Sequence, residues 1–190
     1  MSSASTVSKQ NQVEKSPLSL HYLGDRVLRK PTKRINKINQ SIRDLAQEMV
    51  QTMYAEQGIG LAAPQVGVNK QMLVIDCDPQ NTATPPLVLI NPEIQGYSQE
   101  LARGEEGCLS IPGVFLDVVR PEAIQVKYKD EFGRPQKMKA SGLLARVIQH
   151  EIDHLEGILF VDRVPNDLVL TEALNKQGFS AQAVQTIQSI

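Results

Sequence analysis

The sequence has no tryptophan, and only two cysteines and three histidines occur among its 190 residues. Two cysteines cannot build the disulfide framework of a small secreted domain, so a reducing compartment is the simpler interpretation. No apolar run approaches the roughly 20 residues of a membrane-spanning helix. A net charge of −1 shows no excess of basic residues of the kind that nucleic-acid binding requires. We therefore expect neither a membrane protein nor one that recognises a nucleic-acid sequence.

The remaining composition, 41% hydrophobic and 22% charged, is ordinary for a globular protein, and the length suits one domain. Residues 1–19 are polar and almost without large apolar side chains, so we expect a disordered N-terminal tail. The tail lacks the apolar core of a secretory signal, and its lack of arginine weakens a transit-peptide interpretation. We expect residues 20–190 to form a single domain, with a C-terminal extension after about residue 165.

Hydrophobic periodicity predicts a helix over 39–57, with Asn39 as N-cap and Gly58 as stop. A second helix begins after Ser141 or Gly142 and ends at Gly157. The glycine-rich segment 58–67 predicts a tight loop. Short apolar runs predict strands over 71–76, 87–91, 114–119, 123–128 and 134–140, the last two joined by a turn at 130–133. Short helices are expected over 165–174 and 180–187. This order predicts an α+β fold, in which mostly antiparallel sheets and strands surround one central helix.

The central helix carries the pattern H-E-x-x-H, formed by His150, Glu151 and His154. Residues four apart lie on one face of a helix, so both imidazoles can bind one metal ion, with Glu151 beside it to move protons. The alternative is a chance match in which both histidines are buried core residues. Leu143 and Val147 continue the histidine stripe, either as plain core or as walls of an apolar pocket that opens onto the metal.

A hydrolytic metal site usually has three protein ligands and one open position. Downstream of His154, the acidic residues Glu156, Asp162, Asp167 and Glu172 lack supporting context. The better candidate lies upstream, in the segment 105–113, which its glycines and Pro112 are expected to bend. Cys108 of this segment can offer a thiolate, although a free cysteine is often only a small buried hydrophobe.

Three segments carry a resemblance to a known family: Gly58-Ile59-Gly60-Leu61-Ala62-Ala63-Pro64-Gln65, Glu106-Gly107-Cys108-Leu109-Ser110 and Gln149-His150-Glu151-Ile152-Asp153-His154. They resemble the three motifs of peptide deformylases, in the family's order, and the similarity runs from about residue 18 to 164. The run is more like the bacterial and plastid type than the mitochondrial type. The resemblance implies a catalytic domain that removes the formyl group from the N-terminal formyl-methionine of newly made polypeptides and releases formate.

The resemblance also implies the site. Cys108, His150 and His154 are the implied ligands of one divalent metal ion, commonly Fe²⁺ in this family, with Zn²⁺, Ni²⁺ or Co²⁺ as other occupants. Glu151 is the implied proton carrier, and Gln65 and the backbone N–H of Leu109 are the implied donors to the oxyanion. The residues expected to bind the peptide and its methionine are Ile59, Gly60, Gly107, Leu143 and Val147.

Glu106, Arg120 and Asp153 are expected to support the metal ligands as a buried network, the alternative being a surface ion pair. The sequence leaves open whether Arg146 borders the methionine pocket or faces solvent. The expected partners are formyl-methionyl nascent peptides and the ribosome exit region. We expect a monomer in the bacterial cytoplasm, and a plastid location is less favoured. Two other hypotheses are a metallopeptidase that cuts internal bonds and a structural metal site, which four protein ligands usually close.

Overall fold

A computed structural model describes residues 16–81 and 83–187. Most of the expected tail, 1–19, therefore lies outside the described residues. Within its last four residues, Leu18 packs against a hydrophobic cluster that includes Met49 and Met53. The backbone N–H of Leu18 donates to Thr52 Oγ1 at 3.2 Å. The chain is thus already in contact with the core at residue 18.

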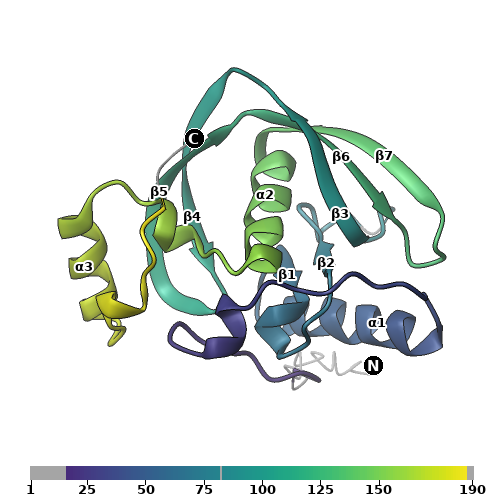
Figure 1. Ribbon diagram of the computed structural model, residues 1–190, viewed down its shortest axis with the longest axis horizontal. Coiled ribbons are helices and arrows are strands. Elements are labelled where there is room, and N and C mark those ends of the chain that lie inside the picture. Colours follow the sequence, from purple (N-terminus) through teal and green to yellow (C-terminus); the bar gives the residue numbers. More distant parts are fainter. Residues whose placement is uncertain (1–15, 82, 188–190) are drawn as a thin grey trace, which may run out of the picture.

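Helix α2 (Gly142–Glu156) stands at the centre of the fold, between a five-stranded sheet and a two-stranded ribbon (Figure 1). Ten of its 15 residues are buried because both sides are covered. The helix starts after Ser141 and ends at Gly157, whose φ of 80° is left-handed. Glycine adopts this conformation without the steric cost that other residues meet, which explains the predicted stop.

The five-stranded sheet has the order β1-β2-β3-β6-β7, and all neighbours are antiparallel. The strands are β1 (Gly60–Ala62), β2 (Met72–Ile75), β3 (Leu87–Tyr97), β6 (Ala123–Lys129) and β7 (Pro135–Ser141). Side chains of β6 alternate, so that Ile124 and Val126 pack with Ile148 and Ile152 of α2. The α+β prediction is confirmed.

Helix α1 (Gln40–Ala55) covers the other face of β2, where Met49 and Met53 pack with Met72 and Val74 (Figure 1). The Asn39 side chain accepts the N–H of Ile42, which confirms the predicted N-cap. The glycine-rich segment 58–67 is more regular than expected. It contains β1 and the 3-10 turn η2 (Ala63–Val66).

The ribbon consists of β4 (Leu101–Cys108) and β5 (Ile111–Pro121). The segment 105–113 bends as expected, but within a hairpin: it is a strand, a turn at 109–110 and a second strand, with Cys108 paired to Ile111. Because a two-stranded ribbon is marginally stable alone, it needs packing from elsewhere. Val114 and Val118 provide it, in a cluster with Phe160 and Val161 of η3 (Phe160–Arg163).

The C-terminal extension packs against the ribbon. It contains α3 (Asp167–Lys176) and the 3-10 turn η4 (Ala181–Ala183). Arg29 of η1 (Arg26–Arg29) connects η4 to η3, because its side chain binds Asp162 and also donates to the Ala183 carbonyl. The helix expected over 180–187 is wrong. Instead, the N–H groups of Gln185 and Ile187 donate to the side chain and backbone of Asp162, at 2.8 and 3.1 Å. Contacts with Asp162 therefore replace helical hydrogen bonds in this segment.

Candidate active site

Three side chains that could hold a metal ion meet between α2 and the ribbon. Cys108 comes from the end of β4, and His150 and His154 lie one turn apart on α2. One ligand atom from each lies within 4.8 Å of the other two, and Cys108 Sγ is 3.2 Å from His154 Nε2. His150 Nδ1 is 2.9 Å from Glu106 Oε2, which leaves its Nε2 for a metal. A thiolate with two imidazoles is a donor set that suits a divalent transition metal.

Glu151 is buried in this site, with 4% of its surface exposed. Burial raises its pKa to about 7, against the opposing charge of His150. Among the residues that the structure describes, Glu151 Oε2 has no hydrogen-bond partner. Gly60 makes this position possible, because a Cβ at Gly60 would overlap Glu151 Oε1 and lie 2.9 Å from Val147. A buried carboxylate with a free oxygen suits a group that accepts a proton.

The amide of Gln65 is fixed at both ends. Its Oε1 accepts the N–H of Ala62 at 2.8 Å, and its Nε2 donates to Ser110 Oγ at 3.1 Å and lies 3.4 Å from Cys108 Sγ. If Gln65 only stabilised its own loop, this would account for the bond to Ala62 but not for the contacts with Ser110 and Cys108. The bond to Ala62 turns the amide nitrogen toward Cys108. Ser110 was not singled out from the sequence, although its place within the motif at 106–110 is a signal.

A cavity of about 600 Å³ opens beside these groups. The predicted residues that line it are Ile59, Gly60, Gln65, Glu106, Gly107, Cys108, Leu109, Leu143, Val147, His150 and Glu151. Leu143 is 54% exposed, so it is not plain core, whereas Val147 is buried. Tyr22 and Phe115 also line the cavity and were missed, because both lie outside the three motifs. His154, Arg120 and Asp153 lie outside the lining.

The expected buried network is present. Arg120 donates to both oxygens of Glu106, at 2.6 and 2.9 Å, and to Asp153 Oδ2 at 2.8 Å. All three side chains are buried, so the surface ion-pair alternative is wrong. Burial alone would raise the pKa of Glu106, but hydrogen bonds from Arg120 and His150 hold it well below its ordinary value. Arg163 of η3 adds two bonds of 2.6 Å to Asp153, and no sequence pattern pointed to it.

Comparisons with known proteins agree with this geometry. The family model described as polypeptide deformylase matches residues 17–168. A peptide deformylase from Picosynechococcus sp. is 64% identical over 171 residues, covering 90% of this chain and 91% of the relative. The solved structure of a peptide deformylase from Synechococcus elongatus in complex with actinonin is 60% identical, with a TM-score of 0.90 over 92% of this chain and 95% of that chain. One from Legionella pneumophila is 41% identical, with a TM-score of 0.79 over 84% and 92%. The chain belongs to the polypeptide deformylase family, whose members are metal-dependent hydrolases that remove the N-formyl group from nascent peptides.

Proposed function

We propose that the chain deformylates N-terminal formyl-methionine at the centre formed by Cys108, His150 and His154, with Glu151 as its proton carrier. The observation that carries this proposal is the buried carboxylate of Glu151, whose Oε2 has no partner in the described part of the chain. It lines the same cavity as Cys108 and His150. A site that must accept and return a proton requires such a group.

A divalent ion held by Cys108, His150 and His154 would orient and polarise the attacking water. Glu151 takes a proton from the attacking water, and the water oxygen forms a bond to the formyl carbon. Negative charge then develops on the formyl oxygen, and the Gln65 amide and the Leu109 N–H donate to it. Glu151 returns the proton to the nitrogen as the C–N bond breaks, which leaves formate and a free amine.

The metal that we propose is Fe²⁺, with Zn²⁺, Ni²⁺ and Co²⁺ as other possible occupants. Imidazole and thiolate ligands accept all of these ions, so availability and geometry decide among them. Metal analysis after anaerobic purification identifies the native ion. Zinc alone in the fully active anaerobic preparation would contradict the iron assignment.

Peptide binding is proposed along β1, which pairs only with β2 and so leaves its second edge free of strand partners within the described sheet. An extended peptide can bond to the backbone there with little demand on sequence. Gly60 and Ile59 supply one side and Gly107 the other. Ile59, Leu143 and Val147 give the cavity apolar walls for the methionine.

None of the described helices is long and apolar enough to cross a membrane. Three curated relatives that are 59–64% identical over at least 90% of this chain come from cyanobacteria, and we therefore propose the bacterial cytoplasm rather than a plastid. The substrates are nascent chains, so we place the enzyme near the ribosome exit region. We also propose that it acts as a monomer.

The decisive experiment is Glu151→Gln, which keeps the shape of the side chain. We expect the metal content to stay and formate release from formyl-Met-Ala-Ser to fall at least about 10²-fold. Glu48→Gln, on an exposed face of α1, is the matched control. Full activity of Glu151→Gln would refute the general base. Cleavage of an unformylated peptide without formate release would support the metallopeptidase alternative instead.

A further inference from the structure

The metal ligands belong to two separate units of the fold. Cys108 is on the β4–β5 ribbon, whereas His150 and His154 are on α2. The ribbon forms its own sheet and shares no ladder with the five-stranded sheet in the described residues. The position of Cys108 relative to the histidines therefore depends in part on side-chain contacts between α2 and the ribbon.

Arg146 of α2 makes the widest of these contacts. Its Nη1 donates to Glu106 Oε1 at 2.8 Å and to the Val118 carbonyl at 3.0 Å, and its Nη2 donates to the Ala102 carbonyl at 2.7 Å. One guanidinium thus reaches β4 and β5 together, with 13% of its side chain exposed. Gly104 leaves room for it, because a Cβ there would lie 3.0 Å from the guanidinium carbon.

Two arginines connect the ribbon and α2, and they do so in opposite directions. Arg120 reaches from β5 to Asp153 on α2, and Arg146 reaches from α2 to Glu106 on β4. Both donate to Glu106 Oε1, while Glu106 Oε2 lies 2.9 Å from His150 Nδ1. Arg146 is thereby linked to a metal ligand through one carboxylate.

We propose that Arg146 is a positioning residue that clamps the ribbon to α2, and so sets Cys108 against His150 and His154. The proposal rests on the metal centre of the proposed function. A planar guanidinium is required, because its fork can address several acceptors in one plane, whereas a lysine ammonium has a single charged centre on a flexible stem. The sequence left open whether Arg146 borders the pocket or faces solvent; it is among the residues that line the cavity, and its hydrogen bonds go to the ribbon.

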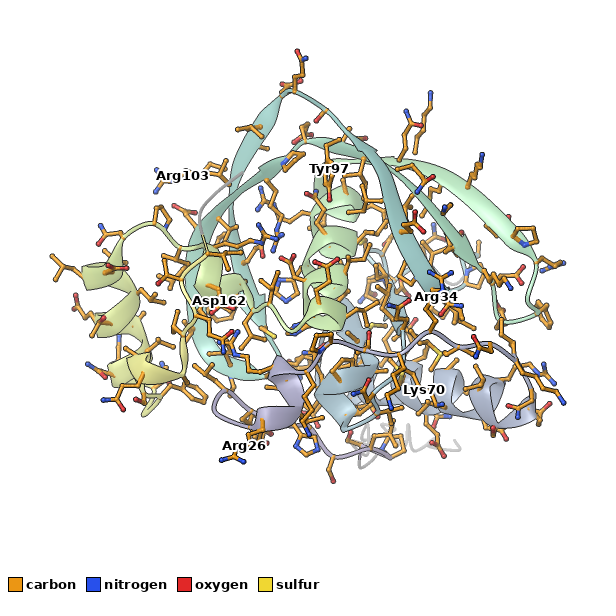
Figure 2. The ribbon with its side chains drawn as sticks, in the orientation of Figure 1. Arg26, Arg34, Lys70, Tyr97, Arg103 and Asp162 are labelled. Carbon is orange, nitrogen blue, oxygen red and sulfur yellow. The ribbon has the colours of Figure 1, made fainter. Side chains whose placement is uncertain are left out.

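The test uses the full chain loaded with Co²⁺, whose visible absorption reports ligand geometry. The variants are Arg146→Met and Arg146→Lys, and the control is Arg103→Met. Arg103 is also on the ribbon but 74% exposed, paired with Asp117 and projecting away from α2 (Figure 2). The rate at which excess EDTA removes Co²⁺ is measured well below the unfolding temperature.

We expect Arg146→Met to lose Co²⁺ about 10- to 100-fold faster than the wild type, with an altered cobalt spectrum. Arg103→Met should match the wild type. A purely structural role would lower the unfolding temperature of Arg146→Met but leave its spectrum and metal-loss rate unchanged, and that result overturns the proposal. If Arg146→Met does not fold, Arg146→Lys decides: faster loss supports the clamp, and a wild-type rate overturns it. A wild-type chain that binds no Co²⁺ would instead refute the metal centre itself.

Discussion

At the scale of single residues, the site depends on Gly60 having no side chain. Gly60 lies so close to Glu151 that a Cβ would overlap Glu151 Oε1. The substitution Gly60→Ala therefore pushes the carboxylate out of place. A misplacement of about 1 Å can cost about 10²-fold in rate, so we expect a drop of that order in kcat with the metal content unchanged. Formate release at saturating formyl-peptide measures it.

The matched control is Gly96→Ala on β3, where a Cβ would meet no atom within 4 Å. Its kcat and stability should stay close to those of the wild type. If Gly60→Ala kept the wild-type kcat, Glu151 could shift without loss, and its close approach to β1 would have no part in catalysis.

At the scale of elements, the end of α2 fixes where the chain turns toward η3. Gly157 has a φ of 80°, and a Cβ there would lie 2.8 Å from the Arg29 carbonyl oxygen. Gly157→Ala thus combines a left-handed backbone with a backbone clash, and we expect it to lower the free energy of unfolding by at least about 2 kcal/mol. Urea denaturation measures this loss.

Gly178→Ala separates the two effects, because Gly178 has a φ of 78° but no atom within 4 Å of a built Cβ. It should cost about 1 kcal/mol, the share of the left-handed backbone alone. Equal losses for the two variants would show that the contact with Arg29 carries no strain.

The same scale shows how far the sequence predicts the fold. Both long helices follow from apolar periodicity, because the residues of a buried helix face lie close together in the sequence. The predicted end signals hold for α2 and for the start of α1, but α1 ends at Ala55, and the left-handed residue after it is Gln57 where Gly58 was the expected stop. β4 was not predicted, since Arg103, Gly104 and Glu105 show no apolar alternation. Its inner side is filled by the polar network of Glu106 and Arg120, a contact between distant segments.

The site residues also differ in whether nearby sequence is enough to predict them. Spacing alone indicates His150, Glu151 and His154, because they lie on one helix. Cys108 was a candidate because no acidic residue downstream of His154 has supporting context, and the resemblance then implied it as a ligand. Gln65 depended on the resemblance alone, since its partners Cys108 and Ser110 lie 43 and 45 residues away. Arg163 could not be predicted, because its bonds to Asp153 exist only once η3 has folded back on α2.

At the scale of the whole molecule, three hydrophobic clusters surround the centre, and the ribbon and sheet pack on different ones. Ile124 and Val126 of β6 pack with α2, whereas Val114 and Val118 of β5 pack with η3 and the C-terminal extension. A metal bound by Cys108, His150 and His154 thus joins two separately packed bodies. Its binding energy is then also energy that holds the ribbon against α2.

Removing the metal should consequently loosen the ribbon before the sheet. A ligand at 100 times its Kd stabilises the folded state by about 2.7 kcal/mol, so chelation should lower the Tm. Hydrogen exchange should accelerate at the β4–β5 amides, because the ribbon has two strands and loses its tie through Cys108, while β6 and β7 keep their packing on α2. Exchange measured by mass spectrometry before and after EDTA tests this, and added Zn²⁺ should restore protection. Equal acceleration in both sheets would mean that the metal stabilises the fold as a whole, without acting at the junction between ribbon and helix.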